Sequence, residues 1–330
     1  MPTLETPFAS LELQRQPHQA NEPLQAFDAA DEYLLGHLHE HGIEAGSRVL
    51  LLNDSFGALA CSLAGRCHVT SSGDSHLGFL ALQKNLASNG LSGDTVTFLP
   101  SCETPQGPFD WILIRVPKTL ALLEEQLIRL HGQLAPNARV VAGAMIKHLP
   151  RAAGDLLEQY IGPVQASLAV KKARLLVATP ETKAAPHSPY PTRYRLDKPA
   201  LELVNHANVF CRDGLDIGTR AFLPHLPRHL GRVRVADLGC GNGVLGIAYA
   251  LGADSLDMVL CNPPFHQQQV VGDFLAWRMF QQARAALVTG GELWIVGNRH
   301  LGYHAKLGRL FRGVEQVAAN PKFVVLKARK

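Results

Sequence analysis

Short apolar runs alternate with amphipathic stretches along most of the chain. An alternation of apolar strands and amphipathic helices is typical of parallel sheets covered by helices. It is interrupted at residues 179–194, which hold four prolines and show no apolar periodicity, so this stretch is interpreted as a linker. The pattern therefore predicts an α/β protein with two domains, residues 1–186 and 187–330.

The two halves resemble each other in four segments that occur in the same order. The matched pairs are 49–60 with 235–246, 109–118 with 256–265, 138–148 with 291–300, and 160–180 with 310–330. The alignment places Asp110 opposite Asp257, and Arg115 opposite Asn262. We interpret the four ordered matches as an internal duplication, with two copies of one α/β fold.

The two copies differ at the turn after their first predicted strand. The second copy reads D-x-G-x-G-x-G from Asp237 to Gly243, whereas the first reads "LNDSFGAL" with a single glycine. Glycines let the backbone turn tightly and approach a ligand, and the next helix presents free N–H groups. A leading acid suits a ligand with a cationic amino group. Glycine-rich turns also serve packing alone, but the pattern favours a cofactor site in the second copy and none in the first.

A second candidate motif is "CNPPF" (261–265), which follows the apolar run "LDMVL". Two prolines remove two backbone donors, so the strand must end there. The rigid turn would place the Asn262 amide and the Pro263 carbonyl at the carboxyl end of a strand, where open α/β sheets bind ligands. These two acceptors can hold both hydrogens of a planar NH2 group, and the Phe265 ring can stack on a flipped base. The alternative is a strand end that happens to contain Pro-Pro, with Phe265 in the core.

Composition narrows the class of protein. A chain of 330 residues with 46% hydrophobic and 18% charged residues is expected to be soluble and globular. The N-terminus lacks the pattern of a signal peptide, and no apolar run is long enough for a bilayer, so we expect no membrane association. The six cysteines form no CxxC pair, which predicts reduced thiols in the cytoplasm and no metal site.

Charge is unevenly distributed between the two halves. From His187 onward there are 18 Lys and Arg against 10 Asp and Glu, a net charge of +8, which leaves −4 for residues 1–186. A basic surface attracts polyanions such as nucleic acids. A solvated basic face without a partner is the alternative.

Several segments together resemble one known family. They are "VFCRDGLDIGTRAFL" (209–223), "VADLGCGNGVLGI", "LCNPPFHQQ" and "GELWIVGNRHLGY…KFVVLKA". Over nearly its whole length the chain resembles the RlmG/RsmC family of duplicated bacterial rRNA guanine-N2 methyltransferases. This resemblance implies two tandem Rossmann-like methyltransferase domains with seven-stranded, mostly parallel sheets and helices on both faces. The first domain would be degenerate and would serve RNA docking and core support, and the second would bind S-adenosylmethionine.

The segment Asn298–Leu301, the "HQQ" after Phe265 and the ending from Lys322 to Ala328 resemble the RlmG branch of the family. That branch implies N2-methylation of guanine 1835 in protein-free 23S rRNA. A methyltransferase that acts on 16S rRNA is the nearest alternative, and a catalytically dead rRNA-binding protein is another.

The resemblance also implies roles for individual residues. The cofactor loop would be formed by Asp237, Gly239 and Gly241, and the target guanine would be gripped and stacked by Asn262, Pro263, Pro264 and Phe265. The cleft near the methionine end of the cofactor would be closed by Phe210, Asp213, Gly218 and Thr219. An alternative for this last segment is helix capping, because Asp216 or Thr219 could equally cap the helix "RAFLPHL".

One departure from the family concerns length. The first copy has 62 residues between Asn53 and Arg115, but the second has only 23 between the aligned Gly239 and Asn262, a deficit of 39. Family members have there the strand whose terminal acid holds the cofactor ribose and the next strand, which contacts adenine. Either that stretch is missing from this sequence or the chain binds S-adenosylmethionine weakly. We favour a missing stretch, because the flanking motifs are intact.

Overall fold

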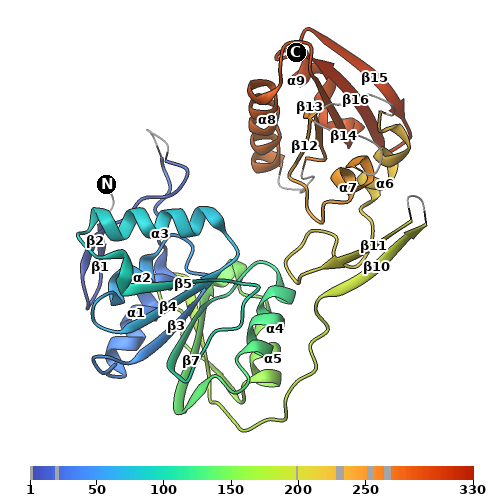
Figure 1. Ribbon diagram of the computed structural model, residues 1–330. Helices are drawn as coiled ribbons and strands as arrows, with labels where there is room; N and C mark the ends of the chain where they lie inside the picture. The colour runs from blue at the N-terminus through green and yellow to red at the C-terminus, as the bar shows by residue number, and fades with distance from the viewer. Residues whose placement is uncertain (1–2, 19–21, 198–199, 228–233, 251–255, 264–268) are drawn as a thin grey trace. The chain divides into compact units, whose positions relative to one another are not determined.

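The computed structural model describes residues 3–18, 22–197, 200–227, 234–250, 256–263 and 269–330. The chain forms two compact units, Met1–Pro189 and Tyr190–Lys330, each with its own sheet (Figure 1). The division falls inside the proline-rich stretch 179–194. Within the described ranges, no helix is both long enough and apolar enough to cross a membrane.

The first unit is built on a seven-stranded sheet with the order β5-β4-β3-β6-β7-β9-β8. Neighbouring strands are parallel except around β9, which is antiparallel to both β7 and β8. The strands are β3 (Arg48–Leu52), β4 (His68–Gly73), β5 (Val96–Pro100), β6 (Phe109–Arg115), β7 (Leu134–Met145), β8 (Val164–Ala166) and β9 (Ala173–Ala178).

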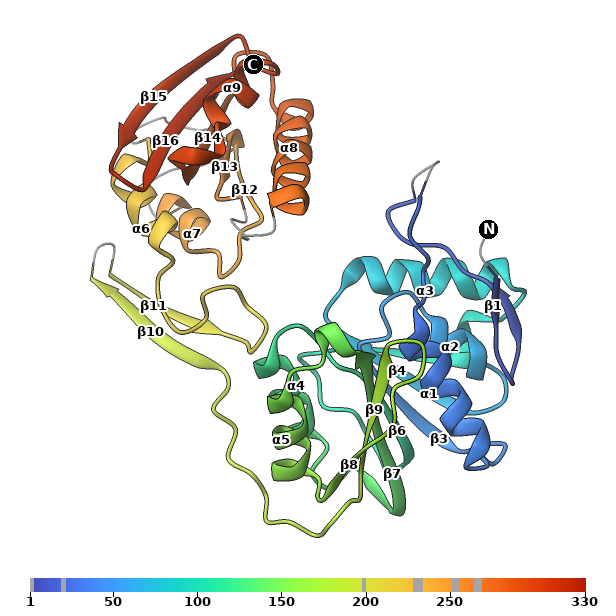
Figure 2. The ribbon, with the colours of Figure 1, turned by 180° about the vertical axis from the view of Figure 1, so that it is seen from behind.

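Helices cover both faces of this sheet (Figures 1 and 2). One face carries α1 (Ala29–Glu40), α2 (Ala58–Leu63), α3 (His76–Ser88) and the strand pair β1 (Thr3–Glu5) and β2 (Ser10–Glu12); the other carries α4 (Leu120–Arg129) and α5 (Arg151–Tyr160). Alternate residues of one strand enter opposite cores, as Leu50 and Leu51 do. Burial on both faces explains why the strands read as continuous apolar runs.

The second unit repeats this architecture with fewer strands. Its described residues form a five-stranded sheet in the order β12-β13-β14-β16-β15, in which β16 is antiparallel to both neighbours. The strands are β12 (Arg234–Leu238), β13 (Leu256–Cys261), β14 (Glu292–Asn298), β15 (Gly313–Ala319) and β16 (Phe323–Arg329). One face is covered by α6 (Ile217–Phe222) and α7 (Val244–Ala250), the other by α8 (Gln269–Ala286) and α9 (Tyr303–Gly308). A separate antiparallel hairpin joins β10 (Thr192–Asp197) and β11 (Ala200–Asn205).

The two sheets confirm the predicted duplication. In sheet order, β12, β13, β14, β16 and β15 correspond to β3, β6, β7, β9 and β8, and the four matched segments lie on these equivalent strands. The expected seven strands are present in the first unit, whereas the described part of the second unit has no counterpart of β4 and β5. The sequence explains the difference, since only residues 251–255 separate α7 from β13. Five residues are too few for two further strands and a connecting helix.

Candidate active site

The glycine turn follows β12 and leads into α7. Gly239, Gly241 and Gly243 have φ angles of 74°, 55° and 76°, in the left-handed region that residues with a side chain rarely adopt. A Cβ at Gly241 would make only an ordinary contact of 3.7 Å with Phe210, so the backbone conformation and not lack of space requires glycine there. The predicted need for glycine is therefore confirmed.

The first unit makes the same turn with different residues. Asn53 and Gly57, which align with Gly239 and Gly243, have φ angles of 64° and 86°. The Asn53 amide exchanges two hydrogen bonds with the buried Gln126, each of 2.9 Å. The first unit therefore has a paired amide at the turn where the second unit has backbone alone.

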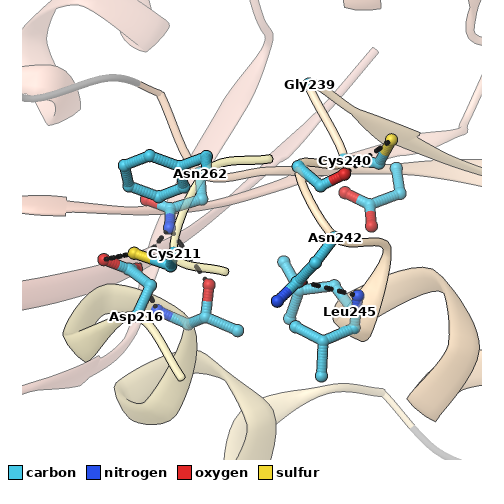
Figure 3. A pocket seen from close by; sticks show the side chains of 12 residues that line it. Cys211, Asp216, Gly239, Cys240, Asn242, Leu245 and Asn262 are labelled. Atoms are coloured by element: carbon cyan, nitrogen blue, oxygen red, sulfur yellow. Dashed lines mark hydrogen bonds between the residues drawn. The ribbon is translucent and has the colours of Figure 1, made fainter. Parts of the chain in front are cut away.

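A pocket that is partly open to solvent lies at the carboxyl ends of β12 and β13 (Figure 3). Six of the residues predicted for the site line it, namely Phe210, Thr219, Asp237, Gly239, Gly241 and Asn262. The other lining residues are Cys211, Asp216, Cys240, Asn242, Val244 and Leu245. The fold thus brings the glycine turn, the segment before α6 and the end of β13 to one place.

Three predicted residues that the structure describes are not part of this lining. Asp213 is exposed and pairs with Arg212 at 3.1 Å, and Gly218 is buried beside Asn262. Pro263 is buried next to Asn262 in the chain. The roles predicted for these three residues stay predictions, as do those of Pro264 and Phe265, which lie outside the described residues.

Asp237 lies at the start of the glycine turn. Its Oδ2 accepts a hydrogen bond of 3.0 Å from the N–H of Gly246 in α7, which fixes the carboxyl group. Burial raises the pKa of the Asp237 carboxyl, and the hydrogen bond from Gly246 partly opposes this shift. A partly desolvated carboxylate that lines a pocket is well suited to a cationic amino group.

The side-chain amide of Asn262 has one defined orientation. Its Nδ2 donates to Asp216 Oδ2 at 2.7 Å and to Thr219 Oγ1 at 3.1 Å. An ionised carboxylate can only accept hydrogen bonds, so the nitrogen of the amide must face Asp216. The buried Asn262 Oδ1 has no hydrogen-bond partner among the described residues. Because a buried acceptor without a partner is costly, this oxygen is suited to a donor that a ligand brings.

Sequence reasoning assigned Asp216 only as an alternative helix cap. The structure confirms the cap, since Asp216 Oδ2 accepts the N–H of Thr219 at 2.8 Å, and it adds the contact with Asn262. Tyr194 was missed altogether: its hydroxyl accepts a bond of 2.6 Å from Asn242 Nδ2 in the glycine turn. These pairs lie 46 and 48 residues apart in the chain. Asp216 and Asp28 cap equivalent helices, α6 and α1, but both lie outside the four matched segments, so the sequence comparison did not pair them.

A glycine turn after the first strand and a pocket at the carboxyl ends of parallel strands are typical of cofactor-binding Rossmann-like enzymes. Comparison with known proteins narrows this class to methyltransferases. Residues 200–255 and 248–327 match the model of the methyltransferase small domain, and residues 1–182 match that of the RLMG N-terminal domain. A solved structure of the T. thermophilus 16S rRNA N2 G1207 methyltransferase (RsmC), in complex with AdoMet and guanosine, has the same fold. It matches with a TM-score of 0.71 over 100% of this chain and 97% of that chain, at 20% identity.

Curated relatives define the family more closely. The ribosomal RNA large subunit methyltransferase G of Ectopseudomonas mendocina (strain ymp) is 78% identical to this chain, and that of Stutzerimonas stutzeri (strain A1501) is 69% identical. Both alignments cover 100% of both proteins. The chain belongs to the ribosomal RNA large subunit methyltransferase G family, as its motifs predicted. The alignments span 374 positions, of which this chain fills 330, so 44 aligned positions have no counterpart here.

Proposed function

We propose that this protein transfers a methyl group from S-adenosylmethionine to the exocyclic N2 of guanine 1835 in protein-free 23S rRNA. The observation that carries the proposal is the oriented amide of Asn262. Its Oδ1 has no hydrogen-bond partner among the described residues, and Asn262 lines the same pocket as the glycine turn. Since the substrate is ribosomal RNA, the reaction would take place in the cytoplasm.

The residues of the pocket fit the cofactor. Gly239 and Gly241 expose bare backbone, and Asp237 offers a carboxylate for the cationic amino group of the methionine part. The bound cofactor supplies a methyl group that its sulfonium centre already activates. The protein therefore has to align the acceptor nitrogen more than to provide a strong base.

Asn262 would supply that alignment. Its Oδ1 accepts one hydrogen of the guanine N2 amino group, and the Pro263 carbonyl is assigned the other. Holding both hydrogens on one side directs the nitrogen lone pair and favours its change from planar toward tetrahedral. By motif, Pro264 keeps the turn rigid and Phe265 stacks on the base.

The first unit is assigned to RNA docking. Two features support the absence of catalysis there: Arg115 stands at the position of Asn262 and is paired with Asp28 and Asp31, and Asn53 is bonded to Gln126. Photo-crosslinking of the intact chain to 23S rRNA tests this assignment. Crosslinked peptides from residues 1–186 are expected, and crosslinks confined to the second unit would contradict a docking role.

The catalytic proposal is tested with purified 23S and 16S rRNA, each incubated separately with the intact chain and labelled S-adenosylmethionine. Mass spectrometry of RNase fragments should locate one methyl group on N2 of guanine 1835 of 23S rRNA. Methylation of 16S rRNA instead would favour the alternative target. No transfer and no cofactor binding by calorimetry would favour a catalytically dead rRNA-binding protein.

A substitution then tests the role of Asn262. Asn262→Ala should reduce transfer to a small residual rate while changing the dissociation constant for S-adenosylmethionine less than about threefold, because the amide contacts the base and not the cofactor. Transfer at the wild-type rate in this variant would remove Asn262 from the mechanism.

A further inference from the structure

We propose that Asp216, assisted by Thr219, is a positioning residue that fixes the side-chain amide of Asn262 with Oδ1 presented to the target amino group. This inference rests on the proposed function, because it concerns the same reaction. Figure 3 shows Asp216 directed toward Asn262, with Cys211 beside it.

An asparagine amide presents an oxygen acceptor at one end and two N–H donors at the other. A flip of the Asn262 amide would present donors to a guanine amino group that itself donates. The bond from Nδ2 to Asp216 Oδ2 opposes that flip, because a carboxylate has no hydrogen to donate to the amide oxygen, whereas the Thr219 hydroxyl can bond to either end of the amide. A bond to an ionised acceptor is also stronger than a neutral one, so Asp216 contributes more than Thr219.

Asp216 is itself held firmly enough to act as a reference point. Its Oδ2 accepts the N–H of Thr219 as the cap of α6, while Oδ1 lies 4.0 Å from Cys211 Sγ. Asp216 Oδ2 therefore accepts hydrogen bonds both from the first turn of α6 and from Asn262 at the end of β13. In turn, α6 packs on β14 and β16, which are central to the sheet.

In the first unit, a helix cap is also bonded to the residue at the end of a neighbouring strand, but the bond is an ion pair. Asp28 caps α1, which packs on β7 and β9 as α6 packs on β14 and β16. Arg115, the equivalent of Asn262, donates to Asp28 at 2.9 Å and pairs with Asp31. Asp31 stands three residues after the cap, as Thr219 does. In both units, the residue at the end of the equivalent strands β6 and β13 is bonded to the N-cap of a helix and to the residue three positions after that cap. The partners suit a guanidinium group in the first unit and an amide in the second.

Two substitutions separate positioning from helix capping. Asp216→Asn is a good helix cap but replaces the acceptor-only carboxylate by an amide that can also donate, whereas Asp216→Ala removes both functions. With intact chain and protein-free 23S rRNA, we expect Asp216→Ala to lower kcat by about 10- to 100-fold. The KM for RNA and the affinity for S-adenosylmethionine should change little, and Asp216→Asn should restore Tm but recover only part of kcat. Wild-type kcat in Asp216→Ala would overturn the proposal.

A double-mutant cycle with Asn262→Ala tests whether Asp216 acts through the amide. If it does, Asp216→Ala should cause no further loss of residual transfer in the Asn262→Ala background, although its effect on Tm should persist. Equal loss in both backgrounds would assign Asp216 to stability alone. Ser75→Ala is the matched control, because it removes the cap of α3 in the first unit, and it should lower Tm without changing kcat.

Hydrogen exchange of the Asn262 side-chain NH2 group does not depend on catalysis, so it tests the positioning role separately from the proposed function. The NH2 resonances of Asn262, assigned by their disappearance in Asn262→Ala, should show slow hydrogen exchange in the intact chain and fast exchange in Asp216→Ala. Unchanged exchange would refute the positioning role. A wild-type chain that methylates neither rRNA but shows the expected change in exchange would instead refute the proposed function and leave the positioning of the amide in place.

Discussion

At the scale of single residues, Gly218 lies against the Asp216–Asn262 pair. A Cβ at Gly218 would be 3.0 Å from Asp216 Oδ2 and 3.3 Å from Asn262 Oδ1, closer than ordinary contacts. We expect Gly218→Ala to push the pair apart and to lower kcat by about tenfold, with Tm nearly unchanged. Steady-state methyl transfer to 23S rRNA measures this effect.

The matched control is Gly36→Ala in α1, where a Cβ would meet no atom within 4 Å. That change should raise stability by about 0.5 to 1 kcal/mol through helix propensity and leave kcat unchanged. Equal kcat in the two alanine variants would mean that the space beside Asn262 does not matter for transfer.

Asp237 gives a prediction of pH dependence. The pKa of its carboxyl is raised by burial, so it takes up a proton at a higher pH than an exposed aspartate does. Only the ionised form attracts the cationic amino group of the cofactor. Affinity for S-adenosylmethionine should therefore fall as pH is lowered from 7 toward this raised pKa.

Calorimetry with Asp237→Asn checks the assignment. The variant should bind S-adenosylmethionine about tenfold more weakly at pH 7, a loss of about 1.4 kcal/mol, and its affinity should stay constant down to pH 5. The same decline in affinity for variant and wild type would show that another group titrates.

At the scale of elements, the β10–β11 hairpin supports two sides of the pocket. Thr192 Oγ1 and Asn205 Nδ2 both donate to the carbonyl of Arg212, at 2.9 and 3.0 Å, and so fix the segment that carries Phe210. Tyr194 extends from the same hairpin to the glycine turn. The hairpin thus aligns the segment before α6 with the cofactor loop.

Tyr194→Phe tests this support. Loss of the hydroxyl removes the partner of Asn242 Nδ2 and should weaken the binding of S-adenosylmethionine by about three- to tenfold, as expected for one hydrogen bond. Tyr33→Phe is the control, because it removes a hydroxyl bond to Leu168 in the first unit and should not affect cofactor binding. If both variants bind the cofactor like wild type, the hairpin is not part of the site.

Local signals predicted the elements better than the contacts between them. The end of β13 and the positive φ angles after β12 followed from Pro-Pro and from glycine, whose effects do not depend on distant residues. The Asn262–Asp216 bond joins positions 46 residues apart and depends on how α6 packs against the sheet. Its length and direction therefore required the three-dimensional structure.

At the scale of the whole molecule, the internal duplication explains why the strands could be predicted from the sequence. It does not predict the side chains by which the two units differ. Internal matches identified equivalent strands before their positions were known, because each copy must bury the same apolar runs. They could not show which side chains occupy each turn. In the first unit, Arg115 forms ion pairs and the Asn53 side chain forms amide hydrogen bonds in the turn region. The roles of these two residues could be interpreted only from the structure.

The described residues of the second unit include no counterpart of β4 and β5, the strands on one side of β3 in the first unit. In the first unit β3 lies between β4 and β6, and Val49–Leu52 are buried; in the second unit β12 has only β13 beside it among the described strands, and its residues are exposed or half-buried. The alignments with the curated relatives leave 44 positions without a counterpart in this chain, a length that a pair of strands and their connections would need.

Supplying these positions should complete the pocket. Insertion of the corresponding stretch of the Ectopseudomonas mendocina relative between Ala253 and Asp254 should cover the free edge of β12 and provide groups for the ribose and adenine of the cofactor. Affinity for S-adenosylmethionine should rise at least about tenfold, or 1.4 kcal/mol, and Tm should increase. A Gly/Ser insertion of equal length should produce neither effect, because it cannot form strands. Equal cofactor affinity of the two insertion variants, measured by calorimetry, would show that the missing strands do not limit binding and that the pocket at Asn262 is sufficient by itself.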